Sequence, residues 1–440
     1  MPTPAVAASA DPVRVLVDPP LADAFNGWRT TATSIRLLPL APGTVYYTWD
    51  TPHGVWKPAT GEIIAPPGKH VLYTRLLLAD GSATPISAEE IKVDFRATGR
   101  PTSTLRPTAT PAADPVGGAA VVRVTAQINP TAGARLIRLG GVNRYATSMR
   151  ISQDAFAQAD TVIIATGADF ADALCASGLA GCVEGPVLLT DPKSLSSPAA
   201  ADIKRLKATR AIIVGGPVAV SPNVANQLKE LGVKVERLGG SNRYETATII
   251  GSRVLSYGHS GGRVFVARGD DFADALTLGP LAYSARAPLV LVTPKTVPSA
   301  TRSYLNANHF SSGCIAGGTV AVSPAVFSAI DGLVGTVARL GGSSRYSTAV
   351  SVAAWGVGNG LASYEAIGIA TGTGFADALC GGVAIGRAGG VVFLTLPGTL
   401  PTETANAIAA IVGEVMDTQI YGGEVAIYPG VFDRVANILR

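Results

Sequence analysis

One eight-residue segment occurs three times along this 440-residue chain, at intervals of about one hundred residues. It reads Arg-Leu-Gly-Gly-x-x-Arg-Tyr and occupies residues 138–145, 237–244 and 339–346. Internal self-similarity constrains a fold more than local propensity does, and a period of this length is the size of a domain rather than of a solenoid repeat. The sequence therefore predicts three copies of one domain over its C-terminal three-quarters.

Two further blocks follow the first one in every copy. Phe-Ala-Asp-Ala-Leu stands at 170–174, 272–276 and 375–379, and Gly-Gly-x-Val-Ala stands at 215–219, 317–321 and 422–426. Between the blocks of the first copy, short apolar runs alternate with helical segments, one of which is opened by Ser221 and Pro222. This alternation predicts right-handed βαβ units and, in each copy, a Rossmann-like parallel sheet covered on both faces.

The three blocks, together with an apolar run ending in Leu-Leu-Thr, resemble the type 2 cell-wall-binding repeat. That family occurs on Gram-positive surface proteins, nearly always in threes, and the resemblance covers residues from about 134 to 440. It implies a pseudo-threefold α/β body that retains a secreted protein on the cell wall without catalysis. The implied partner is an anionic secondary wall polymer or teichoic-type glycan, with peptidoglycan itself as an alternative.

The segment before the repeats has a different pattern. Short alternating runs between Val13 and Phe95 are punctuated by turns such as Pro42-Gly43 and Pro67-Gly68, which predicts an all-β sandwich. The runs 43–50 and 68–72 are similar to bacterial Ig-like modules. Core packing is the favoured role of Trp28, Trp49 and Trp56, with sugar stacking as the alternative. The predicted organisation is an Ig-like domain at 12–96, a Thr/Pro-rich linker at 97–120, and repeats at 121–233, 234–335 and 336–440.

Composition and charge exclude several classes of protein. With 47% hydrophobic and 15% charged residues, the chain is not disordered, and no apolar run of about 18 residues predicts a membrane span. A net charge of +4, without a basic stripe, gives no reason to expect nucleic acid. The N-terminus has no signal-peptide pattern, so either a signal peptide has been removed or export is not encoded here.

The cysteines fit no metal-binding spacing, and no cofactor is expected. Cys175, Cys182, Cys314 and Cys380 are interpreted as small buried side chains, with a disulfide between repeats as the alternative.

Ligands of doubly wound sheets bind beyond the carboxyl ends of the strands, where the repeated blocks are expected. We predict one cleft per copy, with arginine for an anionic substituent, tyrosine for a sugar face and glycine for close approach. The predicted polymer-binding residues are Arg144, Tyr145, Asp172, Arg243, Tyr244, Asp274, Arg345, Tyr346, Asp377, Gly140, Gly141, Gly239, Gly240, Gly341 and Gly342. In the alternative interpretation, each aspartate caps its own helix and pairs with the arginine, which holds the turn.

Copy three departs from the pattern at two positions. Ser344 replaces the asparagine of the other copies, and Gly374 replaces an aspartate. This predicts that Arg345→Ala weakens wall retention less than Arg144→Ala or Arg243→Ala.

Other motifs are weaker. The segment 372–374, Gly-Thr-Gly, lacks a third glycine for a dinucleotide, because Asp377 stands there and would repel phosphate. Arg268-Gly269-Asp270 spells an RGD sequence, but it occupies the strand-to-helix turn of the repeat.

No catalytic centre is predicted. The histidines, His53, His70, His259 and His309, do not recur between copies, and no triad or carboxylate pair can be assembled. The alternatives to a non-catalytic wall-binding protein are a peptidoglycan hydrolase with an unrecognised active site, and an adhesin or surface-layer component that displays the β domain.

Overall fold

The computed structural model describes residues 135–439 continuously and, before them, seven strands between residues 13 and 125. The chain divides into two compact units, Met1–Ala132 and Gly133–Arg440.

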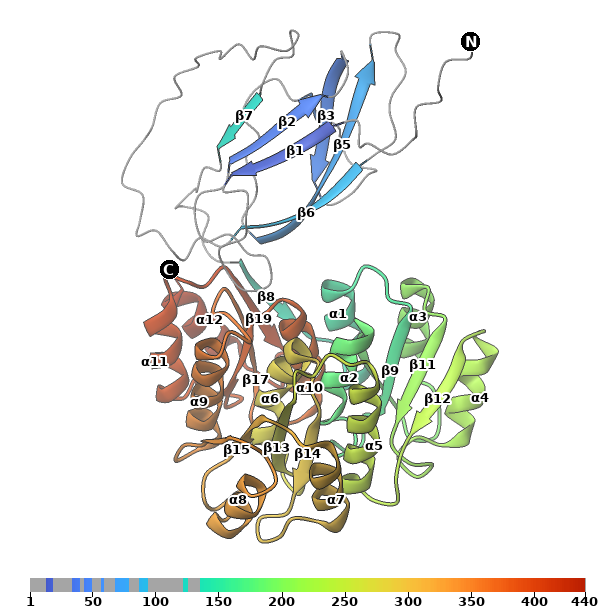
Figure 1. The fold of residues 1–440 in the computed structure, drawn as a ribbon, viewed down its shortest axis with the longest axis vertical. Coiled ribbons are helices and arrows are strands. Elements are labelled where there is room, and N and C mark those ends of the chain that lie inside the picture. The colour runs from blue at the N-terminus through green and yellow to red at the C-terminus, as the bar shows by residue number, and fades with distance from the viewer. Residues whose placement is uncertain are drawn as a thin grey trace, which may run out of the picture. The chain divides into compact units, whose positions relative to one another are not determined.

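The strands of the first unit form two antiparallel sheets (Figure 1). One has the order β1 (Val13–Asp18), β2 (Ser34–Pro39), β7 (Val122–Thr125). The other has the order β4 (Lys57–Pro58), β3 (Gly43–Trp49), β5 (Gly68–Leu78), β6 (Ser87–Val93). The alternating runs are strands as predicted, whereas the Ig-like sandwich stays a prediction. Trp28, Trp56 and the predicted linker at 97–120 lie outside the described residues.

The second unit contains three parallel sheets of four strands each, so the α/β prediction is confirmed for this part of the chain. The first sheet has the order β10 (Val187–Thr190), β9 (Thr161–Thr166), β11 (Arg210–Val214), β12 (Lys234–Leu238). The second has the order β14 (Leu289–Val292), β13 (Arg263–Arg268), β15 (Ser312–Ala316), β16 (Val337–Leu340). The third has the order β18 (Val391–Thr395), β17 (Ala366–Thr371), β19 (Asp417–Tyr421), β8 (Arg135–Leu139). Central strands such as β9 are buried along their whole length, as expected for a sheet covered on both faces.

Helices cover both faces of these sheets. The first copy contains α1 (Arg144–Ala155), α2 (Ala176–Val183), α3 (Ser197–Leu206) and α4 (Pro222–Glu230). The second contains α5 (Arg243–Ser256), α6 (Ala273–Ala285), α7 (Ser299–Asn308) and α8 (Pro324–Asp331). The third contains α9 (Arg345–Gly358), α10 (Ala376–Arg387), α11 (Thr402–Ile411) and α12 (Pro429–Ile438). Ser221 is the N-cap residue of α4 as predicted, but its hydroxyl donates to the Lys193 carbonyl instead of capping the helix.

The copies meet through the helices that follow the Phe-Ala-Asp-Ala-Leu block. Helices α2, α6 and α10 contact one another, and each also contacts the first helix of the next copy, in the pairs α2–α5, α6–α9 and α10–α1. Small residues make this approach possible, since a Cβ at Gly178 or Gly181 would lie 2.1 Å from a carbonyl oxygen of the second copy. The contact between one copy and the first helix of the next copy therefore occurs three times, in cyclic order.

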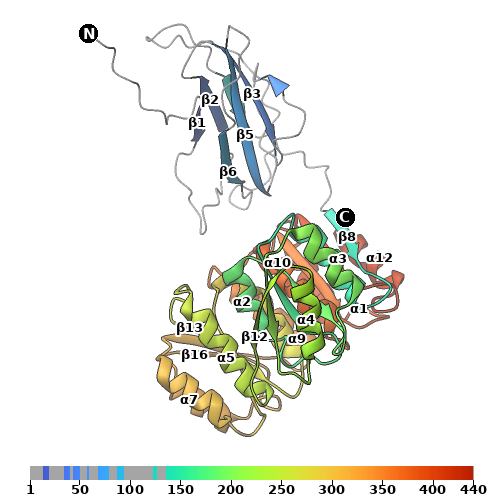
Figure 2. The same cartoon turned by 90° about the vertical axis from the view of Figure 1, so that its right-hand side faces the viewer.

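The strand that opens each copy completes the sheet of the preceding copy. Strand β12, which the sequence analysis assigned to the second copy, pairs with β11 of the first sheet. By the same rule β8 pairs with β19 in the third sheet, from Arg135 opposite Asp417 to Leu139 opposite Tyr421. Figures 1 and 2 both show β8 beside the C-terminal elements. The first strand of the second unit, β8, thus joins the first copy to the third.

The four cysteines are all free, and Cys175, Cys314 and Cys380 are buried, so the alternative of a disulfide between repeats is not realised. Among the described residues, no helix has the length and apolarity needed to cross a membrane.

Candidate functional site

Two pairs of glycines meet at the carboxyl end of each sheet. A Cβ at Gly140 would lie 2.5 Å from the Gly423 nitrogen, and one at Gly239 would lie 2.5 Å from the Gly215 carbonyl carbon. Gly341 likewise faces the Gly318 nitrogen, at 2.8 Å. No larger residue fits where two backbones approach so closely. The first glycine of each predicted pair therefore has a packing role.

The second glycine of each pair lies against the following helix. A Cβ at Gly141, Gly240 or Gly342 would come within 3 Å of that helix's first turn. This packing accounts for the double glycine, and its contact with a polymer stays a prediction.

The first arginine of each Arg-Leu-Gly-Gly block fastens the neighbouring loop, a role that the sequence analysis missed. Arg138 donates to the Ile427 carbonyl at 2.8 Å, Arg237 to the Gly215 carbonyl at 2.8 Å, and Arg339 to the Val322 carbonyl at 2.7 Å. Burial lowers the pKa of all three guanidinium groups. These arginines link two copies.

The predicted aspartates lie partly buried at the junctions between copies. The hydroxyl of Thr246, in the second copy, hydrogen-bonds the carboxylate of Asp172, in the first. The same threonine oxygen accepts the Gly240 N–H at 3.1 Å. A Cβ at Gly215, where φ is +107°, would lie 2.5 Å from the Asp172 carboxylate.

This arrangement recurs for Asp274 with Thr348 and for Asp377 with Thr147. Burial raises the pKa of all three aspartates, and it raises that of Asp377 to about 6. Each aspartate therefore contacts a threonine of the next copy and also interacts electrostatically with the second arginine of that copy's block, the residue type that the alternative interpretation gave it.

The second arginine of each block reaches across the junction to an aromatic ring. The guanidinium carbon of Arg144 lies 5.3 Å from the ring centroid of Phe375, that of Arg243 lies 5.4 Å from Phe170, and that of Arg345 lies 5.8 Å from Phe272. The three phenylalanine rings contact one another, with centroids 5.4, 5.9 and 6.1 Å apart. We call these six side chains the arginine–phenylalanine ring.

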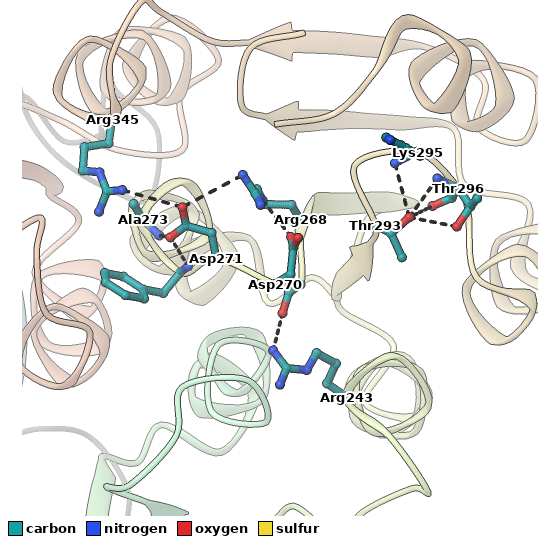
Figure 3. A network of polar contacts seen from close by, with 11 residues as sticks. Arg243, Arg268, Asp270, Asp271, Ala273, Thr293, Lys295, Thr296 and Arg345 are labelled. Atoms are coloured by element: carbon teal, nitrogen blue, oxygen red, sulfur yellow. Dashed lines mark hydrogen bonds and ion pairs between the residues drawn. The ribbon is translucent and has the colours of Figure 1, made fainter. Parts of the chain in front are cut away.

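Hydrogen bonds hold the arginines of the ring in place. Arg144 donates to the Gly167 carbonyl, Arg243 to the Gly269 carbonyl at 2.6 Å, and Arg345 to the Gly372 carbonyl. Arg243 also lies 3.6 Å from the Asp169 carboxylate. Arg345 lies 3.6 Å from the Asp271 carboxylate, as Figure 3 shows.

Each junction therefore combines residues of two copies, which corrects the expectation of one cleft within each copy. The replacement at Gly374 also acts elsewhere than predicted. It lies at the junction of Arg144, whereas Arg345 keeps its carboxylate partner, Asp271. The phenylalanines were not among the predicted site residues, although one aromatic residue recurs beyond a strand end in every copy.

The three predicted tyrosines pack on glycines of their own copies. The ring of Tyr145 lies where a Cβ of Gly167 would be, and the rings of Tyr244 and Tyr346 lie likewise over Gly269 and Gly372. All three tyrosines are half-buried, so part of each ring stays accessible.

The RGD sequence lies in the turn between β13 and α6, as predicted. Within it, Arg268 pairs with Asp270 at 2.8 Å (Figure 3). In the described part of the chain, no cluster of histidine, cysteine and acidic residues could hold a metal ion.

Comparison with known proteins matches the three copies to one family. The cell wall binding domain 2 (CWB2) matches residues 138–225, 237–327 and 339–432.

Two curated relatives come from Bacillus subtilis (strain 168). The N-acetylmuramoyl-L-alanine amidase LytC is 30% identical over 303 residues, which are 69% of this chain and 58% of that protein. The amidase enhancer is 30% identical over 215 residues, which are 49% of this chain and 29% of that protein. The chain spans less than two thirds of either relative.

Two solved structures from Clostridium difficile have a similar fold. Cwp6 has a TM-score of 0.67 at 16% sequence identity, and the match covers 98% of this chain and 68% of the Cwp6 chain. Cwp8 has a TM-score of 0.62 at 19% sequence identity, and the match covers 90% of this chain and 63% of the Cwp8 chain. Since the family matches most of the residues between 138 and 432, the chain belongs to the cell wall binding domain 2 family and carries three tandem copies of that domain.

Proposed function

We propose that this protein is a non-catalytic module that holds a secreted protein on the cell wall by binding an anionic wall polymer non-covalently. The observation that carries the proposal is the arginine–phenylalanine ring. It gathers three guanidinium groups, one from each cell wall binding domain, at the carboxyl ends of the sheets.

The chemistry of the ring suits an anionic glycan. A guanidinium group offers several donors in a plane and matches a carboxylate or phosphate. Stacking on phenylalanine and donation to a glycine carbonyl fix each group in advance, which lowers the entropy lost on binding. Three linked contacts on one polymer would add avidity to weak individual sites.

The two histidines of the second unit lie away from the arginine–phenylalanine ring. His259 and His309 are exposed and precede β13 and β15, so they lie toward the amino ends of the second sheet. The ring lies beyond the opposite ends of the strands. An amidase name belongs to one longer relative, and we do not transfer that activity to this chain.

Retention on purified wall sacculi tests the proposal. The full chain should bind intact sacculi, and it should lose binding when acid extraction removes the secondary polymer. Retention after extraction would favour peptidoglycan as the partner.

Release of soluble muropeptides during the incubation would instead establish a peptidoglycan hydrolase. Absence of binding to either preparation would leave an adhesin or surface-layer role as the surviving alternative.

A further inference from the structure

We infer that the junction between the third and first copies, centred on Arg144, is the position of the ring that accepts an anionic group. The inference rests on the proposed function and deepens it, because it assigns one of three similar junctions to the ligand. The assigned ligand is a carboxylate or phosphate carried by a sugar unit.

The three junctions share their neutral contacts but differ in exposed charge. Arg243 faces the Asp169 carboxylate at 3.6 Å. Asp270 also points toward Arg243 and interacts with it electrostatically (Figure 3). Arg345 faces Asp271 at 3.6 Å. These carboxylates already occupy the positions that a bound anion would take.

The equivalent positions around Arg144 are neutral. Gly374 stands where the other copies have Asp169 and Asp271, and Ala168 stands where the second copy has Asp270. Among the described residues, Arg144 forms no ion pair, and it is exposed, whereas Arg243 and Arg345 are half-buried.

Two other acidic groups near this junction do not remove the difference. Asp377 lies behind Arg144 and interacts with it electrostatically, but Asp172 and Asp274 do the same for Arg243 and Arg345. Asp191 acts on the neighbouring Tyr145. Arg144 therefore has one exposed carboxylate fewer beside it than Arg345 and two fewer than Arg243.

The remaining contacts leave the Arg144 guanidinium fixed but available. Donation to the Gly167 carbonyl uses one of its terminal nitrogens, and Phe375 supports its plane at 5.3 Å. The carboxylate that faces the other terminal nitrogen in the second and third copies is missing here. An incoming anion would meet an oriented donor without first displacing a carboxylate of the protein.

Exchange of one residue between junctions tests the inference. Gly374→Asp supplies the missing carboxylate, and the site accepts a side chain, because a Cβ at Gly374 would meet only the Thr371 methyl group at 3.5 Å. Asp169→Gly is the reciprocal variant, which removes one of the two carboxylates beside Arg243. Retention of the full chain on sacculi should fall about tenfold for Gly374→Asp and rise for Asp169→Gly. Arg144→Lys, which keeps the charge, should lose less retention than Arg144→Ala.

A second readout uses small probes and does not depend on the wall. The Nε–Hε resonance of Arg144 should shift on titration with glucuronate or glycerol phosphate, and more than those of Arg243 and Arg345. The probe that acts at lower concentration identifies a carboxylate or a phosphate as the natural group. In Gly374→Asp the Arg144 shift should disappear.

The two readouts separate the inference from the proposed function. Retention of the wild type with no response to either exchange would overturn the assignment of this junction and leave wall binding standing. If the wild type is not retained, wall binding fails, and the titration still decides whether Arg144 accepts anions. Equal shifts of all three arginines would contradict the inference.

Discussion

The first two junctions of the ring differ from the third in connectivity and in charge. At the first two, the chain runs directly from the last strand of one sheet into the next copy, as from β12 into α5. At the third, β8 joins β19, although Arg138 and its partner Gly422 are 284 positions apart. At the third junction, in addition, no exposed carboxylate forms an ion pair with Arg144, whereas Arg243 and Arg345 each have one.

This comparison separates two kinds of interaction. The pairing of a partly buried aspartate with a buried threonine of the next copy is present at all three junctions. The exposed ion pairs are present at only two, and exposed pairs contribute little to stability. The contacts inside the junctions are therefore the same at all three positions, whereas the exposed charges differ between the junctions.

The largest expected effect tests whether the closing strand is as firmly integrated as the others. Leu139, Leu238 and Leu340 end equivalent strands and are 6%, 6% and 5% exposed. Replacement of any of them by alanine should lower the free energy of unfolding by about 2–5 kcal/mol. Denaturant unfolding of Leu139→Ala and of Leu238→Ala measures the free energy of unfolding that each variant loses relative to the wild type. A loss below about 1 kcal/mol for Leu139→Ala alone would mean that β8 is not held as tightly as β12.

The pH dependence of stability should be strongest at the third junction. Burial raises the pKa of Asp377 from its ordinary value of 3.8 to about 6, so the folded state holds this proton more tightly than the unfolded chain does. The resulting stability is complete below about pH 4 and is lost as the pH rises through 6, by about 3 kcal/mol in all.

Thermal melts between pH 4.5 and 7.5 should therefore show a falling melting temperature, less steep in Asp377→Asn. Asp172→Asn is the matched control, because the pKa of Asp172 is also raised by burial. Its effect on the slope of melting temperature against pH should be smaller than that of Asp377→Asn. An unchanged slope in Asp377→Asn would show that this carboxyl group does not titrate in the range.

A smaller effect concerns the close approach of the two glycine loops at the closing junction. Gly140→Ala should cost about 1–3 kcal/mol, because its Cβ would meet the Gly423 nitrogen at 2.5 Å. Gly430→Ala, in the first turn of α12, has no atom within 4 Å and should be neutral or stabilising by up to about 1 kcal/mol. Thermal melts of both variants check the difference, and equal stability would contradict the described contact between the loops.

The smallest effect concerns the exposed ion pairs. Asp271→Asn should lower stability by less than about 1 kcal/mol, because the pair with Arg345 is partly exposed. The variant keeps the oxygen that accepts the Phe272 N–H. Its difference from the wild type should vanish in 1 M salt, where the Debye length is about 3 Å. A larger loss, independent of salt, would mean that this pair supports the ring structurally.

The sequence alone determined the three copies and the alternation of strands and helices within the first of them. The three repeated blocks defined the copies, and apolar β-branched runs such as 161–166 became central, fully buried strands. Both features depend on local pattern, because a strand with apolar residues on both faces is stable only inside a parallel sheet.

The tertiary structure alone decided which residues act together. Arg144 stacks on Phe375 of the third copy, and β8 completes a sheet whose other strands come from the end of the chain. Spacing within one copy carries no information on such contacts, because they arise from the cyclic docking of one copy on the next. For this reason the sequence identified the residue types of the site but placed Gly374 beside the wrong arginine.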